Sequence, residues 1–498
     1  MAEQTKNSTV AAGESGGRKA KMLSLALDLV PMGTDEENRM ADLKVSKTLP
    51  DGIESKMLYS DIVHIAWPSL VELTLTQLAS MVDLMMVGQL GPWALTAVGL
   101  TTQPKFLLMT MFMAMNVGAT AMVARYKGAG DQKRANEILR QGLLMTFVLG
   151  MVFSVIGFIT APWLIKFMGA SEAHVLEASV TYLRIQMIGL PGLALTSTIT
   201  ATLRGVGNSK TAMIYNAAAN ILNVFFNYML IYGHFGAPRM EVAGASLATI
   251  IGQYCAMFMA FYAVMNGRQY LVLRFKDGFK PNKTEIGKIV DIGAPAMVEQ
   301  LVMRAGMIIY TRTVAGLGTL AYAVHQVCMN IQSLSFMNGQ AFAVSATSLS
   351  GQSLGRKRHD MAQAYISRTR KLGMCVSIFL GVIFFFFGGQ IVALYSGGDQ
   401  SLVDLGGKIM MFVALVQPFQ SSQLILAGAL RGAGDTKVTA VITFLTVLLV
   451  RPALAIFAIN VLGMGLEGAW VALVIDQILR SLLVLLRYNS GAWKRHTM

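Results

Sequence analysis

The sequence predicts an all-α integral membrane protein of twelve transmembrane helices, arranged as two parallel six-helix repeats. The first observation is composition. Of the 498 residues 54% are hydrophobic and only 14% are charged, whereas soluble domains carry about 25% charged residues. The second observation is a series of apolar segments long enough to cross a bilayer as helices. The third is an internal repeat that divides these segments between two halves.

Twelve spans follow one another with short loops between them. We place them approximately at 60–88, 93–124, 134–163, 174–203, 209–232, 242–266, 284–315, 320–353, 360–394, 402–430, 436–461 and 466–489. Lys and Arg are absent from the loops at 89–92, 316–319 and 462–465 but frequent in the loops after even-numbered spans. Because cytoplasmic loops carry an excess of Lys and Arg, we expect both termini in the cytoplasm of a plasma-membrane protein.

The repeat becomes visible when the chain is shifted by 227 residues. Pro68 to Glu72 then coincides with Pro295 to Glu299, and LRGVGNSK at 203–210 coincides with LRGAGDTK at 430–437. The offset holds across five spans and drops to 224 in the sixth. An even number of spans per half gives both copies the same orientation, so an axis along the membrane normal relates them, with a central cleft between them.

This division predicts five regions. They are a polar, disordered cytoplasmic arm (1–56), a first six-helix half (57–266), a cytoplasmic linker (267–283), a second half (284–490) and a cytoplasmic tail (491–498). The net charge of +14 would suit a nucleic-acid partner. Because the basic residues lie in short loops between apolar spans, we expect a lipid bilayer around the protein and no nucleic acid.

The first span carries two acids on one face. At about 100° per residue, Glu72, Thr76, Ser80 and Asp83 share a narrow stripe of the helix. A carboxylate in hydrocarbon costs several kcal/mol, so it normally faces a bundle interior or a water-filled cavity. Asp83 is therefore a candidate functional residue. For Glu72, near the membrane edge, a carboxylate hydrogen-bonded to a neighbouring helix is the structural alternative.

The fifth span carries four asparagines on one face. Asn216, Asn220, Asn223 and Asn227 have Thr443, Val447, Val450 and Leu454 as repeat counterparts, and the counterpart of Asp83 is Tyr310. An amide stripe alone can hold membrane helices together. With an acid in the same half it favours a cation or proton site. Carboxylate, carbonyl and hydroxyl oxygens suit Na⁺, whereas a lone desolvated carboxylate suits H⁺.

Other polar residues within the spans are candidates for the lining of the cleft. This set comprises Thr76, Ser80, Asn216, Asn220, Glu299, His325, Gln326 and Arg451. Two of them have structural alternatives: Glu299 can pair with Arg304 or Arg312, and Arg451 can pair with Asp476. Lys105 either faces the cleft or extends toward the membrane surface.

Several segments resemble the MATE (multidrug and toxic compound extrusion) transporters. They are VDLMMVGQLG in span one, LRGVGNSKTAMIYNAAANILNVFFNYMLIYG across spans four and five, and SGQSLGRKRHDMAQA after span eight. The resemblance covers about residues 57–490. It implies a V-shaped, twelve-helix antiporter of the MOP superfamily that exports amphipathic, often cationic compounds in exchange for Na⁺ or H⁺. We expect a monomer without a cofactor.

The resemblance also implies roles for individual residues. The family's span-one acid matches Asp83, and its span-five Asn-x-x-x-Asp/Asn pair matches Asn223 and Asn227. The second position is Asn here and Asp in some archaeal members, which leaves Na⁺ and H⁺ both open. The family's span-seven acid falls near Met303, so that role is not transferred to Glu299. The pattern is closer to the DinF-like and archaeal members.

Two other functions remain as alternatives. The superfamily includes flippases for lipid-linked precursors, which would need an Arg-rich cleft for a pyrophosphate. Arg304, Arg312 and Arg451 are candidates for such a cleft. A membrane-embedded enzyme or channel has no supporting motif. The loop at 128–135, GAGDQKRA, lacks the Lys-Ser/Thr ending of a phosphate-binding loop, so the sequence predicts neither an enzyme nor nucleotide binding.

Overall fold

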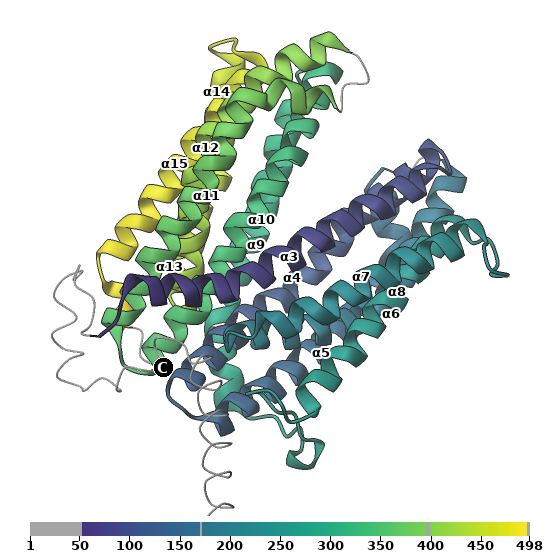
Figure 1. Ribbon diagram of the computed structural model, residues 1–498. Coiled ribbons are helices and arrows are strands. Elements are labelled where there is room, and N and C mark those ends of the chain that lie inside the picture. The colour runs from purple at the N-terminus through teal and green to yellow at the C-terminus, as the bar shows by residue number, and fades with distance from the viewer. Residues whose placement is uncertain (1–51, 170–171, 395–398, 496–498) are drawn as a thin grey trace, which may run out of the picture.

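The computed structural model describes residues 52–169, 172–394 and 399–495, which contain helices and no strands. The helices of the first half, labelled as in Figure 1, are α3 (Ser55–Gly88), α4 (Pro92–Gly128), α5 (Gln132–Phe167), α6 (Ala173–Gly205), α7 (Ser209–Tyr232) and α8 (Glu241–Met265). Those of the second half are α9 (Lys283–Ala315), α10 (Thr319–Gly355), α11 (His359–Ala393), α12 (Gln400–Gly432), α13 (Thr436–Thr443), α14 (Arg451–Asn460) and α15 (Gly465–Asn489). A short 3-10 helix, η2 (Phe275–Asp277), lies in the linker between the halves.

The predicted eleventh span consists of three pieces. A π-helical segment, η3 (Phe444–Val450), joins α13 to α14. Pro452 lies in the first turn of α14, where its ring lacks an N–H and displaces the carbonyl of the preceding turn. A π-helical turn accommodates such a disturbance without ending the helix. The chain at this proline therefore forms a widened turn within a continuous span.

The outer surface is that of a multi-pass membrane protein. Among the described residues, ten helices are long and apolar enough to cross a bilayer. The exceptions, α6 and α10, are 33 and 37 residues long, carry many Ser, Thr, Gly and Gln residues and lie largely inside the bundle. Large apolar side chains such as Ile159, Trp163, Phe385 and Phe386 are exposed on the outside. A surface of this kind requires a lipid environment.

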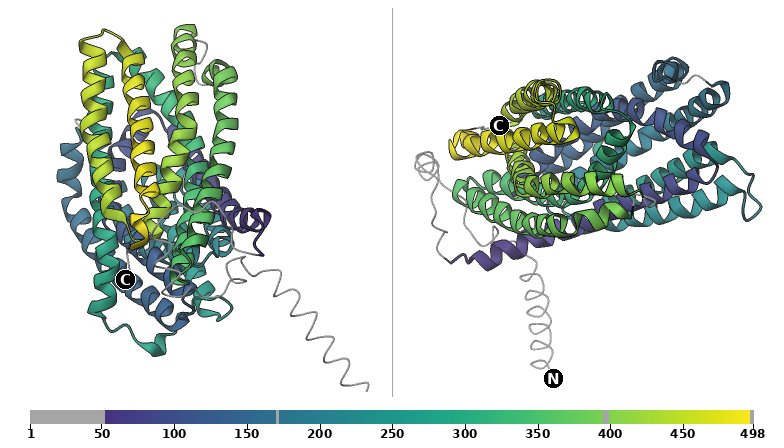
Figure 2. Two further views of the ribbon diagram at one scale, coloured as in Figure 1. Left: turned by 90° about the vertical axis from the view of Figure 1, so that its left-hand side faces the viewer. Right: turned by 90° about the horizontal axis from the view of Figure 1, so that it is seen from above.

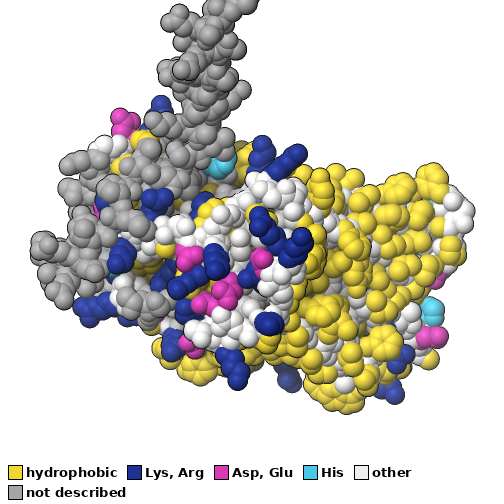
Figure 3. Space-filling model, turned by 90° about the horizontal axis from the view of Figure 1, so that it is seen from below, with side chains coloured by type: hydrophobic (Ala, Val, Ile, Leu, Met, Phe, Trp, Pro, Cys, Tyr) yellow, Lys and Arg dark blue, Asp and Glu magenta, His cyan; other side chains and the backbone are white. Residues whose placement is uncertain are grey.

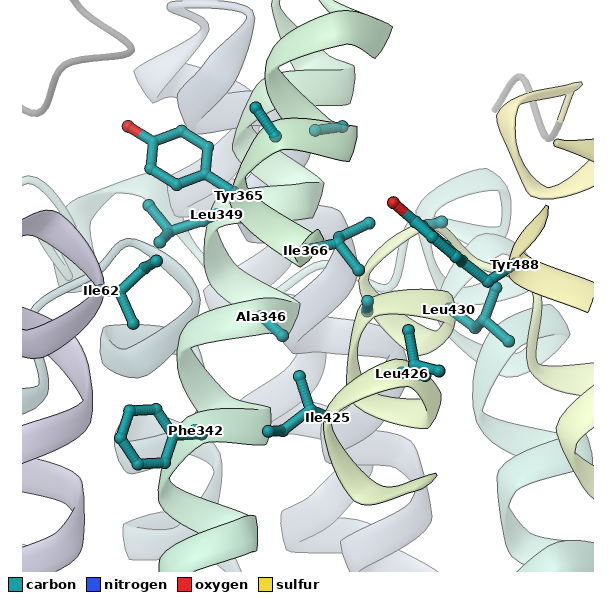
Figure 4. Close-up of a cluster of buried hydrophobic side chains, with 14 of the residues drawn as sticks. Ile62, Phe342, Ala346, Leu349, Tyr365, Ile366, Ile425, Leu426, Leu430 and Tyr488 are labelled. Carbon is teal, nitrogen blue, oxygen red and sulfur yellow. The ribbon is translucent and has the colours of Figure 1, made fainter. Parts of the chain in front are cut away.

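The two halves converge at one end of the molecule and diverge at the other (Figure 1). Seen from above, they lie side by side (Figure 2). The first span of each half crosses to the other half at the converging end. There α3 packs on α10 and α11, and α9 packs on α4 and α5. Figure 4 shows Ile62 of α3 in one buried cluster with Leu349 of α10 and Tyr365 of α11.

Two glycines allow the closest approach at this converging end. A Cβ atom on Gly128 would lie 1.9 Å from the carbonyl oxygen of Gln352, and one on Gly355 would lie 2.0 Å from that of Arg125. These two contacts are related by the repeat. Lys and Arg side chains gather on the same end, whereas the flank is hydrophobic (Figure 3). We call this end of the molecule the basic end.

The packed part of the chain extends slightly beyond the two predicted halves. Ile53 is buried in the cluster with Ile62, and α3 begins at Ser55. Trp493 in the predicted tail is also buried, and its Nε1 donates to the carbonyl oxygen of Tyr488 at 2.9 Å. Residues 1–51 of the predicted arm lie outside the described residues.

Candidate functional site

The candidate site is a cavity of about 790 Å³ within the first half. Its walls come from α3, α4, α6, α7 and α8, and every described residue that lines it belongs to the first half. Asp83 and Asn223 line it, together with Thr76, Ser80, Asn216 and Asn220. The structure therefore brings together the acid stripe of span one and the amide stripe of span five.

The two stripes form a ladder between α3 and α7. The partners in each rung differ by 144 in residue number, so the helices run parallel and in register. The rungs are Asn216 Nδ2 to Glu72 Oε1 at 2.6 Å, Asn220 Nδ2 to Thr76 Oγ1 at 3.0 Å, and Asn227 Nδ2 to Asp83 Oδ1. Each asparagine satisfies an oxygen that would otherwise face an apolar interior.

Asp83 is held by amides alone. Asn227 donates to its Oδ1. With its amide oriented so that both ends are satisfied, Asn223 donates to Oδ1 and Oδ2 at 3.0 and 3.1 Å and accepts from the Thr249 N–H at 3.3 Å. Asn227 is fully buried, and its own Oδ1 has no hydrogen-bond partner among the described residues. Asn227 thus donates to Asp83, a carboxylate without an ion pair, and also carries a carbonyl oxygen that is available to a ligand.

Glu72 lies in the same cavity but in a different electrostatic environment. Its carboxylate forms an ion pair with Arg204 at 2.7 Å, and only 4% of the residue is exposed. The repeat reproduces this pair in the second half, where Glu299 and Arg431 lie 2.8 Å apart. Both acids thus have the partners of structural carboxylates.

Glu299 corrects one expectation from the sequence. Its partners are Arg431 and the Thr439 hydroxyl, not Arg304 or Arg312. With 1% of its surface exposed, it is enclosed between helices and does not line the cavity. Glu299 lies on the inner face of span seven, as the helical pattern predicts, but neighbouring side chains fill the space on that face.

The other second-half candidates are also outside the cavity. His325 is 2% exposed and lies between the rings of Tyr310 and Trp470, with centroid distances of 5.6 Å. Gln326 donates to the Tyr322 hydroxyl at 2.8 Å. Neither residue lines the cavity of the first half.

Arg451 is the fourth of the cleft-lining candidates that lies outside the cavity. It forms a buried ion pair with Asp476, which Arg480 joins at 2.7 Å. This pairing is the structural alternative that the sequence offered. Aromatic packing and ion pairing thus fill the part of the second half that contains these candidates.

Thr76 and Ser80 line the cavity, but their hydroxyl protons are used within α3. Thr76 Oγ1 donates to the Glu72 carbonyl at 2.9 Å, and Ser80 Oγ donates to the Thr76 carbonyl at 3.1 Å. Their oxygens therefore act as acceptors toward the cavity. Such oxygens suit a cation or a polar ligand group.

The sequence did not identify one charged residue of the cavity and left the position of a second one open. Arg204 lines it as the partner of Glu72, and Lys105 projects from α4. For Arg204 a signal existed, because both Glu72 and Arg204 recur in the second half at the same offset as Glu299 and Arg431. For Lys105 the sequence left two positions open, and the structure places it in the cavity.

Comparison with known proteins agrees with this architecture. The MatE family model matches residues 68–229 and 295–457, once in each half. The "Probable multidrug resistance protein NorM" of Thermotoga maritima is 27% identical over 439 residues, which cover 88% of this chain and 94% of the relative. "Multidrug resistance protein PmpM" of Pseudomonas aeruginosa is 28% identical over 403 residues, covering 79% and 83%.

Solved structures share the fold. A MOP superfamily transporter from Pyrococcus furiosus superposes with a TM-score of 0.81 at 21% identity, covering 90% of this chain and all of that one. A MATE family transporter in an outward-facing conformation gives 0.81 at 20% identity, covering 93% and 100%. The predicted twelve-helix fold is thereby confirmed, and the chain belongs to the MatE family of membrane transporters.

Proposed function

We propose that this protein is a secondary active exporter that moves amphipathic, often cationic compounds out of the cell in exchange for Na⁺ or H⁺. Multidrug resistance proteins among its relatives support the export of drug-like molecules. Members of this family are transporters that need no cofactor and draw on ion gradients. One chain contains both halves and the whole cavity, so we propose that a monomer suffices.

The observation that carries the proposal is the environment of Asp83. Its carboxylate accepts hydrogen bonds only from neutral amides at the wall of a cavity within the membrane. A carboxylate in such a place is stabilised by a bound cation or by a proton. We assign ion coupling to Asp83, Asn223 and Asn227, with the unpaired Oδ1 of Asn227 as a further oxygen ligand for Na⁺ or an acceptor for a protonated Asp83.

Coupling requires that the ion prefer one conformation. A ligand shifts an equilibrium only by the difference between its affinities for the two states. We infer from the positive-inside rule that the basic end is cytoplasmic, so the halves are closed toward the cytoplasm and diverge toward the outside. An ion that reaches Asp83 from outside then competes with the cargo and favours its release, whereas loading requires the basic end to open.

Of the three arginines that a flippase could use to bind a pyrophosphate, one is unavailable in this structure. Arg451 is committed to Asp476. Arg304 and Arg312 have no carboxylate within 4.0 Å among the described residues, but the cavity lies in the other half and contains the acids Glu72 and Asp83. A pyrophosphate would be repelled by an unneutralised Asp83, which favours the exporter.

Efflux from proteoliposomes tests the proposal and identifies the ion. Purified protein is reconstituted with a fluorescent amphipathic cation, and either a Na⁺ gradient or a pH gradient is imposed. We expect one of the two gradients to drive accumulation of the dye against its own gradient. Equal, gradient-independent leakage under both conditions would contradict secondary active transport.

A further inference from the structure

The cavity contains an ammonium group that ion coupling does not use. Lys105 projects from α4, and its Nζ donates to Gln186 Oε1 at 2.7 Å. No carboxylate oxygen of the described residues lies within 4.0 Å of that nitrogen. An ammonium has three N–H donors, and this one has a single, neutral partner. Lys105 therefore retains donors that can reach a ligand in the cavity.

The position of Lys105 makes a purely structural role difficult to explain. A lysine within a membrane span is costly and usually pairs with an acid or extends to the membrane surface. Lys105 instead lines the same cavity as Asp83 without forming an ion pair with it. Gln186, its one partner, is itself buried and donates weakly to the Ser246 carbonyl at 3.4 Å. The side chain is thus held in place without a direct ion pair, although Asp83 is near enough to attract its charge.

A second cation lies over an aromatic ring of the cavity wall. Phe106, the next residue of α4, also lines the cavity, and the guanidinium of Arg304 from α9 lies 4.7 Å from the centre of its ring. Arg304 also lacks a carboxylate within 4.0 Å among the described residues. Because α9 belongs to the second half and α4 to the first, this arginine adds a positive charge where the two halves meet.

The charges of the cavity indicate which ligand group would meet Lys105. The four charged lining residues are Glu72, Asp83, Lys105 and Arg204. Glu72 and Arg204 neutralise each other, so Asp83 and Lys105 remain as opposite charges that attract each other without forming a direct ion pair. A ligand that carries only a cation meets repulsion at Lys105, whereas one that also carries an acid group gains a charge-assisted hydrogen bond there.

We propose that Lys105 is a specificity-determining residue that binds the acid group of amphipathic substrates, so that the cavity prefers zwitterionic compounds to compounds that carry a cation alone. The inference rests on the proposed export function and defines its substrate class. It differs from a role in which Lys105 serves as an internal counter-charge for Asp83. In that case loss of the lysine would alter the transport of every substrate equally.

Two dyes that differ by one ester separate these roles. Rhodamine B carries a carboxylate and a delocalised cation, whereas its methyl ester retains the cation alone. Binding of each to the purified protein is measured by fluorescence polarisation, and gradient-driven transport is measured in proteoliposomes. The variants are Lys105→Gln, Lys105→Arg and, as a matched loss of one positive charge outside the cavity, Lys276→Gln in η2.

We expect wild-type protein to bind rhodamine B more tightly than the ester. Lys105→Gln should weaken the binding of rhodamine B by about tenfold or more, the scale of a lost hydrogen bond to a charged group, while the ester binds equally well or better. Lys105→Arg should retain the preference, and Lys276→Gln should leave both affinities unchanged.

Absence of a preference in the wild type, or equal losses for both dyes in Lys105→Gln, would overturn the proposal. The equilibrium measurement needs no ion gradient, so it tests Lys105 even if secondary active transport were wrong. Conversely, Asp83→Asn should abolish driven transport of both dyes without changing which of them is bound more tightly. The two proposals can therefore fail separately.

Discussion

The two acids of α3 that line the cavity differ in what balances their charge. Glu72 faces the guanidinium of Arg204 at 2.7 Å, whereas Asp83 accepts only from the amides of Asn223 and Asn227. A carboxylate already paired with arginine gains little from a second cation. Asp83 is therefore the acid of this cavity whose charge is available to an incoming ion.

The amides around Asp83 should tune the affinity for that ion. Asn227→Ala removes one donor to the carboxylate and one unpaired oxygen, and Asn223→Ala removes a donor. We expect either change to raise the ion concentration for half-maximal efflux by roughly tenfold, while transport continues at saturating ion. Asn220→Ala is the control, because Asn220 contacts Thr76 and not Asp83. An equal effect of this control would show that the stripe acts only as helix packing.

The ion pair of Glu299 with Arg431 should be structural. Glu299→Ala leaves a buried guanidinium without its carboxylate, which typically costs about 3–5 kcal/mol. We expect a clear loss of thermal stability in detergent, measured by unfolding of the purified protein. Glu467→Ala breaks the more exposed contact with Lys408 at 3.8 Å and should cost at most about 1 kcal/mol. Similar losses in both variants would contradict the assignment.

Sequence patterns predicted the grouping of Asp83 with the asparagines but not the fate of the second-half candidates. Helical periodicity shows which face of a span turns inward, and the repeat showed that only one half carries both stripes. Neither pattern distinguishes a cavity from a packed interior. His325 and Glu299 lie on inward faces as expected, but aromatic rings surround the first and an arginine holds the second.

At the scale of helices, the span boundaries were predicted to within a few residues, because loops and apolar runs alternate clearly. The crossing of α3 and α9 to the opposite half was not predicted. An apolar face specifies burial but not which helix covers it. The hydrogen bond from Tyr365 of α11 to Asp61 of α3, at 2.7 Å, is one contact that only the folded structure reveals.

Closure of the basic end should depend on Gly128. A methyl group there would overlap the carbonyl oxygen of Gln352, and a backbone atom cannot move aside as a side chain can. We expect Gly128→Ala to shift the protein toward conformations in which the halves separate at this end. Spin labels at Lys133 and Lys357 should then report longer distances in reconstituted protein.

Gly287→Ala supplies the control for this substitution. It makes the same chemical change on α9, where a Cβ meets nothing within 4 Å. An unchanged distance distribution in Gly128→Ala, or the same shift in both variants, would show that the glycine contact does not hold the halves together.

At the scale of the whole molecule, the repeat gives the two halves similar folds and paired contacts, but only the first half carries the proposed ion site. Paired contacts such as Gly128 with Gln352 and Gly355 with Arg125 join the halves at the basic end. The cavity, by contrast, lies only in the first half. This asymmetry was readable from the sequence as the loss of both polar stripes in the second copy, whereas the size of the cavity was not, and the position of Lys105 was left open.

The orientation of the molecule can be tested by thiol labelling. In a background without Cys255, Cys328 and Cys375, single cysteines replace exposed residues in the loops or in the first turn of the following helix. Those at Gln89 and Thr319 should react with a membrane-impermeant reagent added to intact cells. Those at Lys133 and Lys357 should react only after the membrane is opened, since cytoplasmic loops carry the basic residues. Reversed labelling of both pairs would invert the proposed direction of transport.

The most direct test of the account compares two acids in one assay. Asp83→Asn keeps size and hydrogen bonding but removes the charge that a coupling ion would neutralise, and Glu299→Gln makes the same change at the repeat-related ion pair. Efflux under the driving gradient is measured in proteoliposomes and normalised to folded protein. We expect Asp83→Asn to lose driven efflux but still bind substrate, and Glu299→Gln to transport. Normal efflux by Asp83→Asn together with an inactive Glu299→Gln would place the ion site in the second half and contradict it.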